Sequence, residues 1–353
     1  MRKLASIQKI ESLSPIEGAD RIELAHILGW QVIVKKDEFK VGDLCVYIEI
    51  DSLLPEKPEF EFLRPKGFKI KTMKMKGVIS QGICFPLSIL PKKAYKEEDD
   101  VTSIIGVTKY EKDDDQREQP ITYKKTRIPK FLLRYSFFRK IFLKKEKKKG
   151  FPSWIRKTDE ERIQTIPKIL ERYSEEVWEV SEKLDGTSAT YGIRRNGPRK
   201  EFVICSRNHE LDDKDNHYYE MAQKYSIKDI VLSYLGKDKN VKKIVIQGEI
   251  IGPGIQKNKY NLKEKDLYIF NIIVNDIKMS RAELIELCIL SGLKHVPYLF
   301  KEKKIGSVEE AIALSIGTSF LCSRNREGIV CRLKNDPWTS FKVINPNFLL
   351  EEK

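Results

Sequence analysis

A lysine, an aspartate and a glycine stand close together in Lys183-Leu184-Asp185-Gly186. A short apolar run typical of a strand precedes the motif and another follows it, and Asp-Gly is a common turn pair, so we expect a hairpin here. A lysine fixed there could attack a phosphorus atom as a free amine. An ordinary lysine has a pKa of about 10.4, and lowering it by about 3 units costs the ammonium roughly 4 kcal/mol. Burial and nearby cations could supply that free energy, whereas an exposed lysine beside a turn would do no chemistry.

Three further charged residues stand in or beside apolar strand patterns. Glu249 lies in an otherwise apolar strand that ends in glycines, and Lys342 lies within Ser340-Phe341-Lys342-Val343-Ile344. Glu327 comes directly before another strand pattern. A charged side chain in such a strand usually faces solvent, but one that faces inward must be paired or bind a ligand. These residues are candidates for a charged site, and a structural ion pair between Glu327 and Lys342 is the alternative.

Two more residues complete this ordered series. Arg207 follows a predicted strand, and Phe270 lies in the strand pattern 266–273. Arg207 could equally be an ordinary surface arginine, and Phe270 could be plain core. His209 and His217 are expected at the surface and not as metal ligands.

The composition favours a polyanionic partner. The 353 residues contain 66 Lys and Arg against 52 Asp and Glu, a formal net charge of +14, which favours nucleic acid; a lysine-rich genome is the alternative explanation. The six cysteines form no Cys-x-x-Cys pair, so we expect no zinc site or disulfide framework and a cytoplasmic location. No apolar stretch approaches the ~20 residues that a membrane span needs, and the N-terminus does not resemble a signal peptide.

The first 90 residues resemble a small all-β domain. Short β-rich runs separated by turn clusters occur at 4–10, 21–27, 30–35 and 44–50, a spacing typical of a barrel or sandwich. A later stretch, 69–82, alternates lysines with apolar residues. As a strand it would place lysines together on one face, where they could follow a phosphodiester backbone. These nucleic-acid candidates are Lys69, Lys71, Lys74 and Lys76.

The remainder of the chain divides at a charged segment. Residues 91–150 carry acidic clusters and then a basic stretch, from Lys124 to Lys149, with aromatic residues between the charges; we interpret them as a linker with a short basic helix. Residues 151–353 are expected to form the larger domain. A helix start is expected at Thr158-Asp159-Glu160-Glu161. Further helices are expected over 218–235 and 281–290, and strands over 243–251, 266–273, 328–333 and 340–344.

This ordered series resembles the motifs of the covalent nucleotidyltransferases, which comprise ATP-dependent DNA ligases, RNA ligases and mRNA capping enzymes. Within that superfamily the chain is similar to RNA ligases with an N-terminal OB-type domain. Similar phrases occur at 71–75, 80–82, 157–164 and 340–344. The resemblance implies an α+β protein: an N-terminal β-barrel of OB type (1–90), the linker (91–150), and a nucleotidyltransferase domain of mixed, mainly antiparallel sheets with flanking helices (151–353).

The resemblance implies an ATP-dependent RNA ligase that joins 3′-OH and 5′-phosphate ends in three steps. Lys183 would attack the ATP α-phosphate and form lysyl-AMP, the AMP would pass to an RNA 5′-phosphate, and a 3′-OH would then displace it. Lys342 would hold the α-phosphate, and Arg207 would contact the AMP ribose or the incoming 5′-phosphate. Such reactions depend on positioning and on cationic stabilisation of phosphorus centres.

The remaining roles that the resemblance implies concern the nucleotide and a metal ion. Phe270 would stack on adenine, and Glu249 would bind the ribose hydroxyls. Glu327 would orient a hydrated Mg²⁺ or Mn²⁺ that helps to keep Lys183 neutral. Asp185 would shape the site and hold the nucleotide or RNA end. Glu182, the residue before the nucleophile, is assigned to the nucleotide site.

One departure from the family pattern concerns the last motif, which often has a Lys-x-Lys pair. Ser340 stands where the first lysine would be, and a nearby cation such as Lys334 could replace it. DNA ligases and capping enzymes normally carry an OB domain after this motif, whereas this sequence ends at Lys353, which disfavours both classes. A non-catalytic nucleic-acid-binding relative, or a tRNA-binding module, is the other alternative. We expect a monomer that acts on nicked duplex RNA, without a membrane partner.

Overall fold

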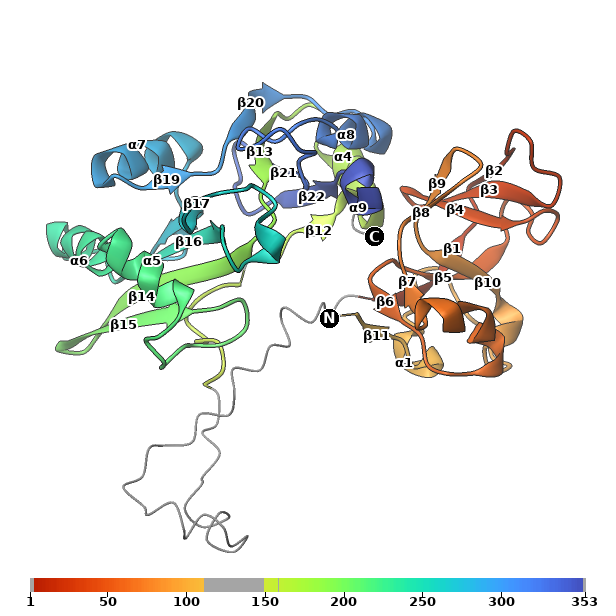
Figure 1. Cartoon of the computed structure of the whole chain (residues 1–353), viewed down its shortest axis with the longest axis horizontal. Coiled ribbons are helices and arrows are strands. Elements are labelled where there is room, and N and C mark those ends of the chain that lie inside the picture. Colours follow the sequence, from red (N-terminus) through yellow and green to blue (C-terminus); the bar gives the residue numbers. More distant parts are fainter. Residues whose placement is uncertain (1–2, 111–148, 158, 352–353) are drawn as a thin grey trace, which may run out of the picture. The chain divides into compact units, whose positions relative to one another are not determined.

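The computed structural model describes residues 3–110, 149–157 and 159–351 (Figure 1). The chain divides into two compact units: the first comprises Met1–Tyr110, Asp159–Leu184 and Val296–Lys353, and the second comprises Glu111–Thr158 and Asp185–His295. The expected domain over 151–353 is therefore shared between both units. Most of the basic aromatic segment expected between Lys124 and Lys149 lies outside the described residues. Among the described residues, no helix is both long and apolar enough to cross a membrane.

The described residues 3–110 form small antiparallel sheets around one apolar core. One sheet has the order β1 (Ala5–Lys9), β5 (Leu44–Ile48), β10 (Ile83–Pro86), and a second has the order β2 (Ser12–Pro15), β3 (Ile22–Ile27), β4 (Trp30–Lys35). The four strands expected from the β-rich runs are confirmed. In β4 the inward positions alternate as Trp30, Val32 and Val34, the period of two that places one face of a strand in the core.

Residues 91–110 complete this core and do not belong to a linker. α1 (Thr102–Ile105) and β11 (Thr108–Lys109) follow the sheets, and β11 pairs with β6 (Ser52–Leu53). Val101, Ile105 and Val107 are buried in the core cluster of the N-terminal residues. The boundary expected at residue 90 is therefore too early, because the acidic cluster just before α1 concealed a short apolar pattern.

The stretch 69–82 is not one strand, contrary to the expectation from its alternating pattern. It contains β7 (Lys69–Ile70) and the hairpin of β8 (Met73–Met75) and β9 (Val78–Ser80); the 3-10 helices η1 (Pro58–Lys66) and η2 (Leu87–Ile89) flank this region. The hairpin turn is Lys76-Gly77, with φ of 49° and 81°. Two positive φ values in succession are what a tight hairpin requires.

The four basic candidates therefore do not share one strand face. Lys69 is half-buried, and its Nζ lies 4.2 Å from the centroid of the Tyr110 ring. Lys71, Lys74 and Lys76 are exposed on and beside the β8–β9 hairpin.

The rest of the first unit is built on a five-stranded sheet. Its order is β12 (Glu161–Arg162), β22 (Ser340–Ile344), β21 (Gly328–Leu333), β13 (Trp178–Lys183), β20 (Tyr298–Lys303). The β12–β22 pair is parallel, and the other pairs are antiparallel. The expected helix start at 158–161 is wrong, since Glu161 already belongs to β12, and η4 (Ile163–Thr165) and α4 (Lys168–Arg172) follow that strand.

One face of this sheet is apolar and the other carries charge. The buried face includes Trp178, Val180 and Phe341, packed with α8 (Val308–Ser315); α9 (Pro346–Glu351) ends the described chain. Alternation along each strand turns Lys183 and Lys342 to the opposite face. The strands expected over 328–333 and 340–344 are confirmed as β21 and β22.

Within the first unit, short polar contacts join the N-terminal sheets to η4 and its neighbours. The Gly29 N–H donates to the Gln164 carbonyl over 3.0 Å, and the Thr165 hydroxyl lies 3.1 Å from Glu49 Oε1. Gly29 has no room for a side chain, because a Cβ there would lie 2.8 Å from Gln164 Cα. The N-terminal core is thereby fixed to the segment that leads into the five-stranded sheet.

The second unit contains a six-stranded sheet. Five of its strands form the order β15 (Arg199–Cys205), β14 (Thr187–Asn196), β16 (Lys243–Ile251), β17 (Asp266–Val274), β18 (Ile277–Lys278), while β19 (Lys294–His295) pairs in parallel with β17. The strands expected over 243–251 and 266–273 are confirmed.

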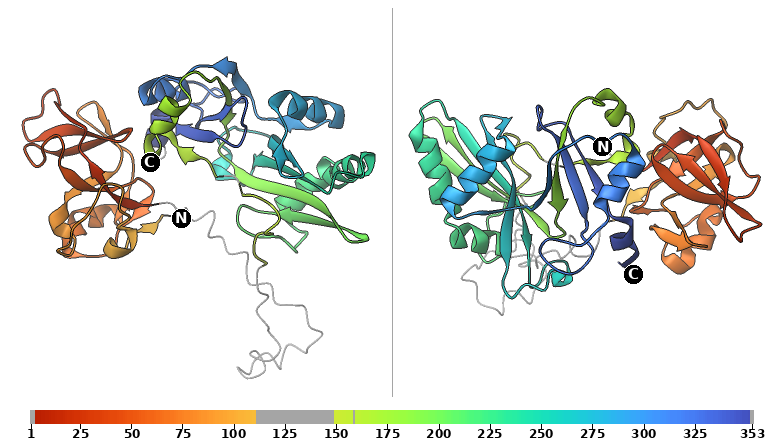
Figure 2. Two further views of the ribbon diagram at one scale, coloured as in Figure 1. Left: turned by 180° about the vertical axis from the view of Figure 1, so that it is seen from behind. Right: turned by 90° about the horizontal axis from the view of Figure 1, so that it is seen from above.

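Three helices cover one face of this sheet, as the right-hand view of Figure 2 shows. They are α5 (His217–Lys224), α6 (Ile227–Lys237) and α7 (Arg281–Ser291). The helix expected over 218–235 is broken at Ser226, which has a φ of 47°. His217, expected at the surface, is half-buried, and burial lowers the pKa of its imidazole.

The lysine motif does not lie on a hairpin. β13, which ends at Lys183, belongs to the five-stranded sheet, and β14, which begins at Thr187, belongs to the six-stranded sheet. Asp185-Gly186 is thus a connection between two sheets. The local sequence could not show this, because the partners of β13 and β14 come from distant parts of the chain.

Gly328 is expected to be irreplaceable because β21 and β22 approach closely there. A Cβ at this position would lie 2.1 Å from the Val343 carbonyl oxygen and 2.9 Å from Ile344 Cα. We expect Gly328→Ala to lower the free energy of unfolding by about 1–3 kcal/mol, as overpacking does, measured by chemical denaturation. Gly236→Ala is the control, because a Cβ there meets nothing within 4 Å and the substitution favours the helix. Equal stability of both variants would contradict the expectation.

Candidate active site

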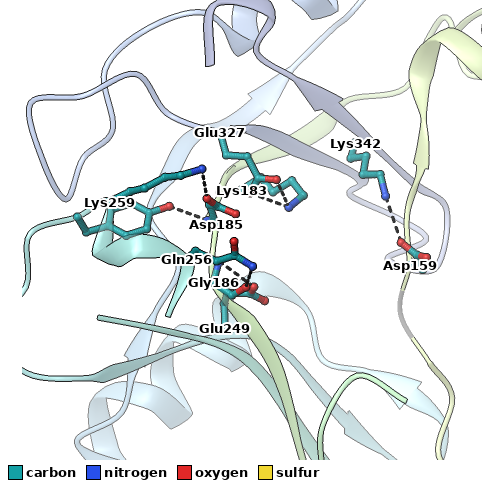
Figure 3. A network of polar contacts seen from close by, with 10 residues as sticks. Asp159, Lys183, Asp185, Gly186, Glu249, Gln256, Lys259, Glu327 and Lys342 are labelled. Atoms are coloured by element: carbon teal, nitrogen blue, oxygen red, sulfur yellow. Dashed lines mark hydrogen bonds and ion pairs between the residues drawn. The ribbon is translucent and has the colours of Figure 1, made fainter. Parts of the chain in front are cut away.

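Lys183 forms a bidentate ion pair with Glu327. Its Nζ lies 2.7 Å from both carboxylate oxygens, and the side chains are 27% and 14% exposed. The pair follows from strand register, since Lys183 lies opposite Gly328 across the β13–β21 ladder. Figure 3 shows the two side chains directed toward each other. The ammonium is therefore held at the end of β13, within reach of solvent.

This ion pair has a consequence for any nucleophilic role of Lys183. A carboxylate beside an amine favours the charged ammonium, whereas attack on phosphorus needs the neutral amine. The Glu327 carboxylate must therefore find another positive partner when the lysine reacts. The sequence analysis predicted both residues in one site but did not predict this ion pair. The alternative that it offered was a pair between Glu327 and Lys342, whereas Lys342 lies 3.1 Å from Asp159 Oδ1.

Lys342 lies on the same face of the five-stranded sheet as Lys183. It stands opposite Val330, which in turn stands opposite Ser181. Burial lowers the pKa of its ammonium; Asp159 opposes this, and the positive charges of Lys183 and Arg162 lower the pKa further. The face thus concentrates positive charge where it is costly without an anionic ligand.

Arg162 is a member of this group that sequence reasoning missed. In the parallel β12–β22 pair it lies beside Lys342. Its guanidinium Nη2 lies 2.6 Å from Asp51 Oδ2, and its side chain is only 9% exposed. The guanidinium also stands 5.8 Å from the Trp30 ring centroid. The available signal was the family-like phrase 157–164, which includes Arg162 but gave it no role.

Ser340 stands where the last motif often has its first lysine, and the residue opposite Ser340 is a cation that could replace that lysine. Ser340 pairs with Arg332 across the β21–β22 ladder, and the Arg332 side chain is 9% exposed, with Nη2 3.4 Å from Glu160 Oε1. Lys334, the example offered from the sequence, is instead exposed and paired with Glu302. Arg332 is therefore the better candidate for the missing positive charge.

Glu182 faces away from Lys183, as neighbours along a strand do. It is 2% exposed, and its Oε2 accepts the Phe320 N–H over 2.9 Å. Burial raises the pKa of its carboxyl, and hydrogen bonds from Ser319 and Phe320 oppose that rise. Its carboxylate thus holds the loop before Glu327, and a contact of its side chain with a nucleotide stays a prediction.

In the second unit, Asp185 and Gly186 are held from two directions. Lys259 Nζ lies 2.5 Å from Asp185 Oδ2, and the Asp185 N–H donates to the Tyr260 hydroxyl over 2.6 Å. The Gly186 N–H donates to Glu249 Oε1 over 3.2 Å. A Cβ on Gly186 would lie 2.3 Å from the Ile250 carbonyl oxygen, so only glycine fits. Figure 3 shows these side chains around the turn.

Phe270 and Glu249 are the half-buried interior positions of β17 and β16, strands that are otherwise buried except at one end. Glu249 lies between Ser188 and Tyr268 in the ladder. Phe270 is the extra residue of a β-bulge, since its neighbours Ile269 and Asn271 pair with consecutive residues of β16. A bulge re-aims a side chain and is common beside active sites. Arg207 is exposed in the loop after β15.

The donor set fits a hydrated divalent ion better than a closed metal cage. No group of three or more His, Cys, Asp or Glu side chains suited to a metal occurs among the described residues. Glu327 offers one carboxylate beside the lysine. Mg²⁺ usually keeps several waters and uses one or two carboxylates together with substrate phosphates, so Glu327 suits such an ion.

Comparisons with known families match both parts of the chain. An OB-fold domain matches residues 4–87, and an RNA ligase model matches residues 176–344. The first confirms the predicted nature of the N-terminal sheets, and the second spans Lys183, Glu249, Glu327 and Lys342. No curated protein sequence matches the chain.

Solved structures match over the full length. A lysine-to-alanine variant of Naegleria gruberi RNA ligase with ATP and Mn is 30% identical, with a TM-score of 0.82 and 99% of each chain covered. A glutamate-to-alanine variant with AMP and Mn is 31% identical, with a TM-score of 0.81 and the same coverage. The Naegleria gruberi enzyme with PPi is 31% identical, with a TM-score of 0.81, covering 100% of this chain and 99% of its own.

The α+β architecture expected from the sequence, with OB-type sheets first, is confirmed. The chain belongs to the RNA ligase family of ATP-dependent enzymes.

Proposed function

We propose that this protein seals RNA ends that carry a 3′-OH and a 5′-phosphate, and that it does so through a lysyl-AMP intermediate. The observation that carries the proposal is the five-stranded sheet face on which Lys183, Lys342 and Arg162 converge beside Glu327. A lysine held among cations and one carboxylate suits nucleophilic attack on a phosphate. The structures of the Naegleria enzyme with ATP, AMP and Mn support the choice of nucleotide and metal.

In the first step the Lys183 amine attacks the α-phosphorus of ATP. A nitrogen–phosphorus bond forms, the bond to the bridging oxygen breaks, and pyrophosphate leaves with its electron pair. The amine loses its protons to solvent or base. The Lys342 ammonium would balance the charge that builds on the α-phosphate oxygens, and Arg162 would add positive charge for the leaving pyrophosphate.

In the second and third steps the RNA ends react. An oxygen of the RNA 5′-phosphate attacks the lysyl-AMP phosphorus and releases the Lys183 amine, forming an AMP–RNA anhydride. The 3′-OH then attacks the activated 5′-phosphorus, forming the phosphodiester and releasing AMP. All three steps are substitutions at phosphorus that depend on positioning and on stabilisation of charge, so one cationic face can serve all three.

Roles in adenosine recognition follow from the second unit. The re-aimed Phe270 ring would stack on adenine, and the Glu249 carboxylate would accept hydrogen bonds from ribose hydroxyls. Arg207, exposed after β15, would contact the ribose or the incoming 5′-phosphate. Asp185 would hold the connection between β13 and β14 in place. The nearby Glu182 would act through the loop that its carboxylate holds.

Glu327 would hold Mg²⁺ or Mn²⁺ through water. Bound there, the ion would give the Glu327 carboxylate a positive partner and add a Lewis acid near the phosphates. Glu327 would then release Lys183 from the ion pair, which leaves the amine able to react. The number of carboxylates available favours an ion that keeps most of its waters.

The RNA partner would be a nicked duplex held by the β8–β9 hairpin. Lys71, Lys74 and Lys76 are exposed there, and exposed lysines contribute sequence-independent contacts to phosphates. Preference for RNA would come from contacts to the 2′-OH near the 3′-OH end. We further propose that the protein acts as a monomer in the cytoplasm.

A non-catalytic binding protein is the rival function. Such a relative would lose the reacting groups, whereas Lys183, Glu327 and Lys342 are all present and two of them are directly paired. The rival also gives no reason for the crowding of cations on one sheet face. A binding protein forms no covalent adduct with ATP, which separates the two functions.

The first prediction concerns the nucleophile. Incubation with ATP and Mg²⁺ or Mn²⁺ is expected to raise the intact mass of the protein by one AMP, and Lys183→Ala is expected to abolish the gain. Lys334→Ala is the control, because Lys334 is an exposed lysine paired with Glu302, and it should gain AMP normally. No gain in the wild type, with the lysine shown to be free beforehand, would refute the ligase function.

The adenylylated protein then tests the substrate. It is offered nicked duplexes that differ only in whether the 3′-OH strand is RNA or DNA. Sealing of the RNA strand supports the proposed function, whereas equal sealing of DNA would replace it by a ligase without sugar preference.

A second prediction uses the lowered pKa of Lys342. Because the pKa lies below the ordinary lysine value, the ammonium is lost as the pH rises through that lowered pKa, and kcat/KM for lysyl-AMP formation should fall there. Lys342→Arg keeps its charge, so its alkaline limb should move to higher pH even if its rate at neutral pH is lower. Lys334→Arg is the matched control. An unchanged alkaline limb in Lys342→Arg would show that another group titrates.

A third prediction concerns the basic hairpin. Replacing Lys71, Lys74 and Lys76 by alanine should weaken binding of a nicked duplex severalfold and reduce its salt dependence, while lysyl-AMP formation stays normal. A matched variant removes three exposed lysines of the second unit, namely Lys228, Lys237 and Lys239. If both triple variants bind the duplex equally well, the hairpin is not the RNA-binding surface.

A further inference from the structure

The segment between β16 and β17 has an unusual backbone. Gln256, Lys257, Asn258 and Asn261 have φ values of 43°, 57°, 48° and 52°. Residues other than glycine rarely adopt this left-handed region, and asparagine tolerates it better than glutamine or lysine. Such conformations persist only where the surroundings impose them, and they gather at functional sites.

The segment is fixed in this conformation by its own hydrogen bonds. Asn258 Oδ1 accepts the Leu262 N–H over 3.1 Å, and its Nδ2 donates to the Leu262 carbonyl over 2.9 Å. The Asn258 N–H donates to the Ile255 carbonyl over 2.7 Å. The unfavourable backbone is therefore a built feature of the second unit, not an open loop.

The side chains of this segment converge on the Asp185-Gly186 connection (Figure 3). Lys259 forms the ion pair with Asp185, and the two side chains are 21% and 11% exposed. Tyr260, which is 7% exposed, accepts the Asp185 N–H. Gln256 Nε2 lies 3.5 Å from the Gly186 carbonyl. One segment thus contacts the carboxylate, the N–H and the carbonyl of a two-residue connection.

Stability alone does not account for this arrangement. Removing a lysine and a carboxylate from water costs free energy that their attraction often fails to recover, and an apolar pair of the same size often serves a fold as well. The left-handed backbone adds a second cost. Both costs fall on the connection that directly follows the proposed nucleophile, Lys183, in the chain.

We propose that Lys259 and Tyr260 are positioning residues for adenylyl transfer, acting through Asp185. Lys259 neutralises and orients the Asp185 carboxylate, so that its negative charge does not oppose the phosphates of the nucleotide. Tyr260 fixes the backbone at Asp185 and thereby the direction in which the chain leaves Lys183. This inference rests on the proposed function, because it names residues that support the same reaction.

The test compares Lys259→Met with Lys257→Met. Both remove one lysine from the same segment, but Lys257 is exposed and lies outside the proposed machinery. We expect Lys259→Met to lower the rate of lysyl-AMP formation at saturating ATP by 10-fold to 100-fold, with an unchanged or higher thermal midpoint, and Lys259→Arg to restore part of the rate. Lys257→Met should match the wild type.

A double-variant cycle shows whether Lys259 acts through Asp185. If it does, Lys259→Met combined with Asp185→Asn should be no slower than Asp185→Asn alone. Multiplied losses in the double variant would overturn the proposal. Tyr260→Phe, which removes only the hydroxyl, should lower the rate by 3-fold to 10-fold, and it tests the proposal even if Lys259→Met does not fold.

The outcomes also separate this inference from the proposed function. A wild-type protein that forms no lysyl-AMP would refute the ligase function itself. A wild type that forms lysyl-AMP, together with Lys259→Met and Tyr260→Phe variants that react at the wild-type rate, would refute the positioning role alone. If the rate of lysyl-AMP formation in the variants falls only in proportion to their fraction of folded protein, the role is purely structural. That result would likewise overturn the positioning role.

Discussion

The ion pair between Lys183 and Glu327 sets the conditions under which the rest of the site has to work. It is fixed by backbone register, since Gly328 places Glu327 beside the last residue of β13. A paired ammonium is a poor nucleophile, so the carboxylate needs a second positive partner before reaction. The other cations of the face, Lys342 and Arg162, are tied to Asp159 and Asp51. The resting site therefore pairs each of these three cations with a carboxylate, and anionic phosphates are the ligands that could replace those partners.

The sequence allowed much of this architecture to be predicted. β16, β17, β21 and β22 are predominantly apolar runs bounded by turn residues, and Glu249, Phe270 and Lys342 within them are the candidates that the sequence marked. The charged candidates, Glu249 and Lys342, could be named because a charge in a buried strand needs a reason. The structure adds that Phe270 is a bulge residue, which no local pattern shows.

What the sequence did not reveal depends on pairing between distant segments. The flanks of Asp185-Gly186 read as a hairpin, yet β13 and β14 join different sheets. Arg162 lies in a segment whose capping pattern indicated a helix, but tertiary pairing with β22 extends it as a strand. The lysines of 69–82 alternate like a strand, but Lys76-Gly77 forms a turn. In each case a long-range contact or a turn outweighed local periodicity.

The contact at Gly29 limits how the N-terminal sheets of such a protein could be replaced by those of another protein in evolution. The N-terminal sheets meet η4 there through backbone atoms, and a Cβ on Gly29 would also lie 2.9 Å from Val308 Cγ1. Side chains at an interface can be altered one by one, but a backbone contact demands one shape from both sides. An OB-type domain taken from another protein would need a glycine at this turn and a carboxylate placed like Asp51. The two parts of the first unit are therefore expected to be inherited together, as one piece and not as separable modules.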